Sequence, residues 1–399
     1  MPILPPAARL GARPERLGCL VFLAAISCTS TSIRDDLARV QDLSHVPTLP
    51  AVAHDEVDAK TDPAIDKLLR EPLDSERAVR IALLANRELR ARLRELGIAR
   101  GRILQAGLLP NPGADLELLP ERSSRFELKV DYDLTRAILA PFRARALGPE
   151  LERERFEVAR AVLDLAYRVR VGLLRVQAGE QRVAIAQQSL LGLRAAQEAA
   201  KAMFDAGNVS ALDVATQETA YEKGAIEVER LALELTRERE HFARVLGIPE
   251  IAPTWKIEAP LPAAPEHAFA PDGLETRSLR ASLELRAARE HLESLAREAG
   301  FTSTEGLIPD IDVDIHALDG RPENGGSLDW RFGAGVSASL PLFDRRQGDA
   351  LALTSSFQAE LERYYGRAGE LRSEARELQQ RVTSAHDRAR RYQEVILPS

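Results

Sequence analysis

Cysteine, methionine and aromatic residues are scarce in this chain. Of its 399 residues, two are Cys, two are Met, two are Trp, and aromatic residues make up only 5%. So few large side chains do not fill a large compact core, and the abundance of Ala, Leu, Glu and Arg is typical of long helices with seams of small residues. Cys19 lies in an N-terminal segment that we expect to be removed. The mature chain would then have no intrachain disulfide and no cysteine-based metal site.

Basic surfaces and catalytic motifs are also lacking. The net charge of −7 excludes a broadly basic nucleic-acid footprint. There is no Cys–His pair in the mature chain, no glycine-rich phosphate loop after a strand and no His-x-x-x-His. We therefore predict that the protein is not an enzyme, has no cofactor and binds no nucleic acid. The seven histidines are scattered, at His45, His54, His241, His267, His291, His316 and His386.

The N-terminus has the pattern of a signal peptide, predicted over residues 1–27. Three arginines precede an apolar run of about ten residues, Leu17–Ile26, which is too short to span a bilayer. The stretch AAISC ends on Cys28 and resembles a bacterial lipobox. Cleavage there would make Cys28 the acylated first residue, a lipid anchor; the alternative is an ordinary signal peptide cut nearby.

Proline is absent between Pro149 and Pro249, and the pattern of this stretch predicts two long helices. It is interrupted by MFDAGNVSALDV, in which Gly207 and Asn208 both tolerate positive φ and mark a turn. Ser210 with Asp213 follows in capping-box order. The pattern predicts a sharp helical hairpin whose first arm, at 1.5 Å per residue, is roughly 85 Å long.

Apolar residues recur every seven positions on both arms, which predicts left-handed coiled-coil packing. The first arm carries Val162, Val169, Val176, Val183 and Leu190, and the second Val214, Tyr221, Val228, Leu235 and Phe242.

Strand patterns follow the Pro110-Asn111-Pro112-Gly113 stretch that ends a helix predicted from residues 73–76 to about Gly107. Nine residues alternate with period 2, the length of a tilted transmembrane strand. Asp115–Leu118 is the expected partner. One face of the strand carries Phe126, Leu128, Val130, Tyr132 and Leu134, and the other Glu127, Lys129, Asp131 and Asp133.

The same order recurs about 200 residues later. Ile311, Val313 and Ile315 lie opposite Asp310, Asp312, Asp314 and His316, and a further alternating strand runs over Trp330–Leu340. The predicted organisation is an extended lead-in (28–73), a first helix-strand-strand-helix-helix repeat (74–247), a Pro/Ala-rich bridge (248–273) and a second repeat (274–399). The fold class is mainly α, with long antiparallel coiled-coil helices and four β-strands.

Four strands are too few to close a membrane barrel, and between long helices their apolar face has nothing to pack against. An ordinary soluble sheet also alternates, but it needs such packing. Three chains supply twelve strands, within the range of membrane barrels. The strands therefore predict an oligomer, most simply a homotrimer.

The motifs ERAVRIALLANRELRAR, QAGLLPNP, FDAGNVSALDV with LTREREHFARVLGI, and ASLPLFDRRQG occur in this order between Ser75 and about Gly348. In them the chain resembles the TolC-type outer-membrane efflux factor family, and PLFDRRQG is closest to its CzcC-like, heavy-metal-efflux branch. The resemblance implies a trimeric duct, a twelve-stranded β-barrel continued by a periplasmic α-helical barrel. It also implies the outer membrane of a Gram-negative-type bacterium, a periplasmic membrane-fusion adaptor and an inner-membrane efflux transporter as partners. The exported substrate, metal cations or drugs, stays open.

Particular residues take roles through this resemblance. Gly207, Asn208 and Val209 match the family's periplasmic tip, where the adaptor docks, and Asp213 matches an aspartate that holds the pore closed. The alternatives are a simple helix-ending turn for the glycine and asparagine and helix capping for Asp213.

The polar strand residues admit two interpretations. Alternate residues of a strand stand about 6–7 Å apart, whereas ligands must meet one ion within about 2–2.6 Å. The set Asp310, Asp312, Asp314 and His316 therefore favours a solvated lumen wall over a metal site, and we predict no bound metal.

The chain reaches Ser399 before the position near 407 where a second tip turn and a returning helix are expected. We therefore expect a C-terminal truncation relative to the family. Two other interpretations of the function stay open: a periplasmic coiled-coil scaffold lipoprotein without a pore, and a non-functional remnant of an efflux duct.

Overall fold

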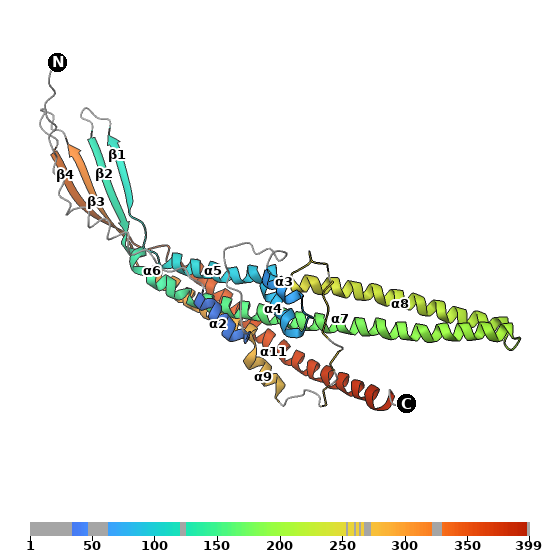
Figure 1. Cartoon of the computed structure of the whole chain (residues 1–399). Helices are drawn as coiled ribbons and strands as arrows, with labels where there is room; N and C mark the ends of the chain where they lie inside the picture. The colour runs from blue at the N-terminus through green and yellow to red at the C-terminus, as the bar shows by residue number, and fades with distance from the viewer. Residues whose placement is uncertain are drawn as a thin grey trace, which may run out of the picture.

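The computed structural model describes residues 34–46, 63–119, 125–252, 254–258, 261–262, 265–266, 273–320 and 329–396. The predicted signal peptide and Cys28 lie outside these residues. The molecule is elongated (Figure 1): a β-sheet lies at one end, a long helical hairpin projects at the other, and shorter helices pack between them.

The order of elements repeats. The first half contains α4 (Ser75–Ala85), α5 (Arg87–Gly107), β1 (Gly113–Leu119), β2 (Arg125–Asp133), α6 (Leu134–Ala146), α7 (Gly148–Asp205) and α8 (Ala211–Leu246). The second contains α9 (Leu274–Ala281), α10 (Leu283–Glu305), β3 (Asp310–Gly320), β4 (Asp329–Ser339), α11 (Gln347–Arg391) and the π-helical turn η3 (Tyr392–Ile396). The four predicted strands and the two predicted arms of the helical hairpin are thus confirmed, whereas α6 was not predicted and begins at Leu134, which was assigned to the strand.

Each half has a break that the sequence analysis missed. The helix expected to run to Gly107 is two helices, because Asn86 adopts an extended conformation and its side chain accepts a hydrogen bond from the backbone N of Leu89 at 3.0 Å. Ser282 does the same between α9 and α10, accepting from Leu285 N at 3.2 Å. Short polar side chains compete with helical hydrogen bonds in this way and favour caps.

The prediction of an extended lead-in over 28–73 was wrong for two segments. α2 (Arg34–Ser44) and α3 (Pro63–Leu69) are helices. Val40 and Ile65 are fully buried in the core. Asp36 is also buried and receives hydrogen bonds from Arg100 (2.7 Å) and Arg155 (2.5 Å). Tertiary contacts therefore fix helices that are too short to show a clear period in the sequence.

The main core lies where α2–α5 cover the first part of α7 and the last turn of α8. Phe242 is fully buried and packs edge-on against Trp255, with ring centroids 5.4 Å apart. The segment after α8 closes this core, since Leu73 N donates to Lys256 O (2.8 Å) and Glu258 N donates to Leu73 O (3.0 Å).

The seven-residue apolar stripe of α7 begins in the main core, where Val162, Val169 and Val176 are fully buried, and continues half-buried toward the tip. From Gly172 to the tip it faces α8. A Cβ atom on Gly172 would lie 2.7 Å from the Phe242 ring, and one on Gly179 would lie 3.0 Å from Leu235. Small residues on α7 thus admit large residues of α8, and the arms pack closely.

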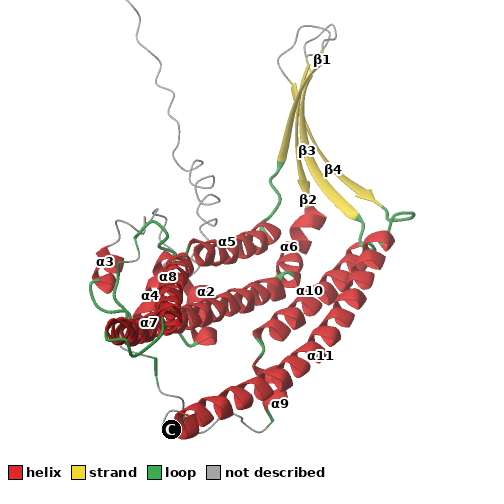
Figure 2. Ribbon diagram, turned by 90° about the vertical axis from the view of Figure 1, so that its right-hand side faces the viewer, coloured by secondary structure: helices red, strands yellow, loops and turns green. Residues whose placement is uncertain are grey.

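The four strands form one antiparallel sheet in the order β1-β2-β3-β4. Its centre joins the two halves, because β2 pairs with β3. Figure 2 shows the sheet rising from the ends of α5, α6, α10 and α11. No helix among the described residues is long and apolar enough to cross a membrane.

Candidate functional site

Register gives the sheet two chemically distinct faces. Lys129 pairs with His316, Asp131 with Asp314 and Asp133 with Asp312, and Glu127 lies on the same face of β2. On β3, Asp310 pairs with Ser339 and Asp312 with Ser337 of β4. All eight predicted polar strand residues therefore lie on one face of the sheet, because side chains alternate along a strand.

Glycines make room for the polar side chains of this face. A Cβ atom on Gly333 would lie 2.2 Å from Nε2 of His316, and one on Gly335 would lie 2.5 Å from Oδ1 of Asp314. His316 Nδ1 lies 3.2 Å from Asp314 Oδ2. Within the described part of the chain, no three or more His, Cys, Asp or Glu residues group as ligands of one metal ion. The geometry thus supports a polar wall.

The opposite face is apolar and open. Across β2 and β3, Val130 pairs with Ile315, and across β3 and β4, Val313 pairs with Val336. Val313 and Ile315 are two residues apart on the same face of β3, so these side chains form one continuous surface. Ile315 is 64% exposed, Phe332 77% and Val336 75%. A contiguous apolar surface of this kind marks an interaction with protein or lipid.

The hairpin tip has the predicted geometry. Gly207 adopts φ +74°, and Asn208 N donates to Met203 O at 2.9 Å, so the chain reverses in five residues between α7 and α8. Gly207 and Asn208 are exposed and Val209 is half-buried. The three residues predicted to dock an adaptor thus form the far end of the molecule (Figure 1).

Asp213 completes the predicted capping box at the start of α8. Its Oδ2 accepts hydrogen bonds from Ser210 Oγ (2.7 Å) and Ser210 N (2.9 Å), while Asp213 N donates to Ser210 Oγ (3.3 Å). The side-chain hydrogen bond from Ser210 lowers the pKa of Asp213 below its ordinary value. The carboxylate therefore stays charged at the exposed tip.

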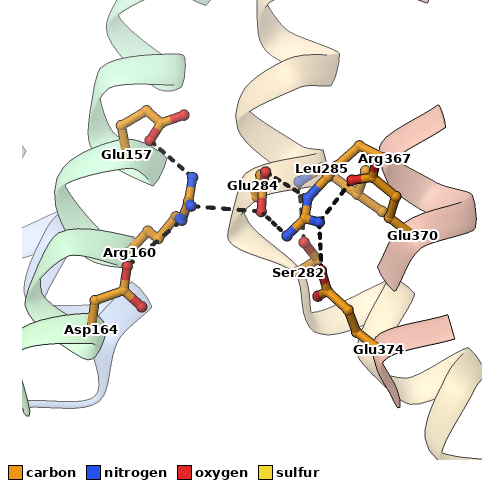
Figure 3. A network of polar contacts seen from close by, with 9 residues as sticks. All are labelled: Glu157, Arg160, Asp164, Ser282, Glu284, Leu285, Arg367, Glu370 and Glu374. Carbon is orange, nitrogen blue, oxygen red and sulfur yellow. Dashed lines mark hydrogen bonds and ion pairs between the residues drawn. The ribbon is translucent and has the colours of Figure 1, made fainter. Parts of the chain in front are cut away.

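A network of charged side chains joins the two halves (Figure 3). Glu284, at the start of α10, accepts hydrogen bonds from Arg367 of α11 at 2.8 and 3.1 Å. It also lies 3.7 Å from Nη2 of Arg160 on α7. Arg367 further donates to Glu370 (3.0 Å) and Glu374 (2.9 Å). Glu284 thus holds α7 and α11 at a fixed spacing, a role that no sequence pattern indicated.

We expect Glu284→Gln to lower the free energy of unfolding by about 1 kcal/mol, because a partly exposed bidentate pair is lost. Chemical denaturation at low and high salt measures it. Arg363→Gln on α11, the helix of Arg367, is the matched control, since among the described residues Arg363 pairs only with the nearby Glu360 and its side chain is 74% exposed. An effect no larger than the control's would contradict the bridging role.

A second link between the halves is sensitive to pH. Glu150 of α7 lies 3.7 Å from Nδ1 of His291 on α10 and accepts a hydrogen bond from Arg153 at 2.6 Å. The interaction with His291 is the largest cause of a pKa lowered from 4.5 to about 2 for Glu150; burial opposes it and Arg153 reinforces it.

Because the folded pKa is below the unfolded one, Glu150 stabilises the fold above about pH 4.5, and this contribution is lost as the pH falls toward 2. We expect Glu150→Gln to flatten the decline in stability over this window. Guanidinium denaturation at several pH values measures the decline. Glu198→Gln, at an exposed site on the same helix, should leave the decline unchanged; equal slopes in both variants would refute the assignment.

The junction between sheet and helices depends on residues that sequence reasoning missed. Thr135 Oγ1 donates to Pro309 O (2.9 Å) and accepts from Ile311 N (2.8 Å), so α6 is tied to the start of β3. The buried carboxylate of Glu305 forms ion pairs with Arg143 (2.5 Å) and Arg346 (2.8 Å). In the sequence, a helix-capping pattern at residues 133–136 is the one local indication that a helix begins at this junction. The contacts of Thr135 and Glu305 join distant parts of the sequence, so no local pattern predicts them.

A two-faced sheet continued by long helical arms is the fold of the TolC-type outer-membrane channels. The structure matches the outer-membrane channel OprN with a TM-score of 0.64 and 19% sequence identity, over 86% of this chain and 84% of that one. It matches the open state of the MtrE channel of Neisseria gonorrhoeae with a TM-score of 0.53 and 18% identity, over 85% and 80% of the two chains.

In sequence, the chain is 26% identical over 308 residues to the cobalt-zinc-cadmium resistance protein CzcC of Cupriavidus metallidurans. The aligned region covers 75% of this chain and 70% of the relative. No family model matches the chain. The predicted resemblance, including its heavy-metal-efflux branch, is thereby confirmed. These relatives are channels and not enzymes, in agreement with the expectation for this chain.

Proposed function

We propose that the protein is the outer-membrane channel of a tripartite efflux pump in a Gram-negative-type bacterium. The observation that carries the proposal is the two-faced sheet: its apolar face is open, and among the described residues β1 and β4 each have one edge without a strand partner. Three copies joined at these edges give twelve strands, enough for a closed membrane barrel. Closure removes the free edges, which are otherwise a site of unspecific pairing.

The remaining parts of the proposal follow from this assembly. The polar face lines the lumen, the helical arms form the periplasmic barrel, and Cys28 anchors the chain in the outer membrane through lipid. At the tip, Gly207, Asn208 and Val209 dock a membrane-fusion adaptor that connects to the inner-membrane transporter. Asp213, charged and exposed at the start of α8, is the proposed gate residue.

For the cargo, we propose small solutes, with heavy-metal cations as the first class to test. The relative CzcC is a cobalt-zinc-cadmium resistance protein. Over Glu127–Asp133 of β2 and Asp310–His316 of β3, the polar face carries one lysine, Lys129, against six carboxylates (Glu127, Asp131, Asp133, Asp310, Asp312 and Asp314). A ring of carboxylates favours passage of cations by electrostatics alone.

The test is expression of the whole chain in a Gram-negative host, followed by extraction of the outer membrane. We expect heat-resistant trimers that conduct ions in planar bilayers. A soluble monomer after removal of the lipid would instead indicate the periplasmic scaffold lipoprotein. The exposed apolar face is the observation that the scaffold leaves unexplained.

A further inference from the structure

An apolar cavity of about 550 Å³ lies below the sheet, between α6 and α10. Its walls include Ile138, Leu139 and Phe142 of α6, Phe301 of α10, and Ile308 in the connection from α10 to β3. The volume is within the range of small-molecule sites, about 300–1,000 Å³. Ile138 is 58% exposed and Phe142 51%, so the cavity opens to the surroundings.

The cavity continues the apolar face of the sheet. α6 begins directly after β2, and Leu134 follows Val130 and Tyr132 in the apolar alternation. Ile138 comes one helical turn after Leu134 and therefore lies on the same side. The apolar surface thus passes from the strands into the cavity, at the end of the sheet where the helices begin.

Positive charge gathers at the rim of the cavity. Arg145 and Arg297 line it, and the carboxylate of Glu305 is already paired with Arg143 and Arg346. Arg297 pairs with Glu293 and donates to the backbone O of Arg145 at 3.3 Å. The guanidinium of Arg145 lies over the Phe142 ring at 5.9 Å. Among the described residues, no carboxylate lies within ion-pair distance of Arg145.

We propose that this cavity binds one acyl chain of an anionic phospholipid, with the phosphate against Arg145. The proposal rests on the proposed function, because only in a membrane does the apolar sheet face lie among acyl chains. An apolar wall with a cation at its mouth matches the two parts of such a lipid. A second copy of the chain is a poorer fit, since α6 and α10 carry the central strands β2 and β3, whereas copies would meet at β1 and β4.

Gly300 offers a test that removes no existing contact. It lines the cavity, and a Cβ atom there would meet nothing within 4 Å. Gly300→Leu is expected to occupy part of the cavity and displace a short length of acyl chain, while improving helix propensity. Gly366→Leu on α11 is the matched control, because Gly366 is helical and equally uncrowded.

The experiment mixes the purified, detergent-solubilised full chain with phosphatidylglycerol or phosphatidylcholine and counts retained lipid by native mass spectrometry. We expect wild type and Gly366→Leu to retain phosphatidylglycerol, and Gly300→Leu to retain about tenfold less, since burial of about two methylene groups is lost. Arg145→Gln should reduce the preference for phosphatidylglycerol about fivefold.

Equal retention by Gly300→Leu and wild type would overturn the proposal, and an unchanged headgroup preference in Arg145→Gln would overturn the role of that residue. Conductance of the same preparations separates this result from the function. Conducting trimers without cavity-dependent lipid binding would reject the lipid site alone. Cavity-dependent lipid binding without conductance would reject the proposed channel alone.

Discussion

Val336→Arg is expected to keep the chain out of the outer membrane, whereas Ser337→Arg, the next residue of β4, is expected to leave it there. Val336 lies on the open apolar face and pairs with Val313, while Ser337 lies on the polar face and pairs with Asp312. An arginine that faces lipid costs about 2–4 kcal/mol near the bilayer midplane and less toward its surfaces. In a trimer this cost is incurred three times.

The measurement is the amount of heat-resistant trimer in the outer-membrane fraction. Even about 2 kcal/mol per chain corresponds to more than a tenfold loss. Because the two sites are adjacent in β4 and receive the same new residue, the variants differ mainly in the face of the sheet on which the arginine lies. Equal trimer yields from the two variants would show that the apolar face does not meet lipid, and the proposed barrel would then fail with it.

Phe242→Ala is expected to lower the free energy of unfolding by about 3–5 kcal/mol, the usual cost of removing a fully buried aromatic ring. The ring fills the space that Gly172 leaves on α7 and contacts Trp255 edge-on. Its removal opens a cavity at the point where both arms enter the core. Denaturation followed by Trp255 and helix content measures the loss.

Leu233→Ala is the control for this prediction, since Leu233 is on the same helix but 64% exposed. A surface substitution of this kind changes stability by no more than about 0.5 kcal/mol. If the two variants unfolded at the same denaturant concentration, the root of α8 would not be the fixed end of the arms.

Local patterns predicted most of the architecture. Period-2 alternation placed β2 and β4 to within one residue and the start of β3 correctly, although β3 runs four residues beyond His316. The Gly207–Asn208 turn with its Ser210–Asp213 box placed the hairpin. These signals depend on neighbours in the sequence, so a single chain is enough to read them. The breaks at Asn86 and Ser282 follow the same capping chemistry, but a polar residue inside an apolar periodic segment gives only a weak signal.

The features that could not be predicted from the sequence depend on contacts between residues far apart in the chain. α2 is helical because Val40 is buried and Asp36 meets two arginines from α5 and α7. Glu284 is important only because Arg160 and Arg367 come near it from different halves. No periodicity marks such residues, since their partners are chosen by the packing of whole helices.

The central pairing of β2 with β3 also determines the order in which the molecule is able to fold. Thr135 and Pro309, which close this pairing at its base, are 174 residues apart. The α7–α8 hairpin and the β1–β2 hairpin need only nearby contacts and form early, whereas closing so long a loop is slow. Until the second half arrives, the first hairpin of strands therefore keeps the edge of β2 that later pairs with β3 free, and in this interval the chain is most exposed to aggregation and to protease.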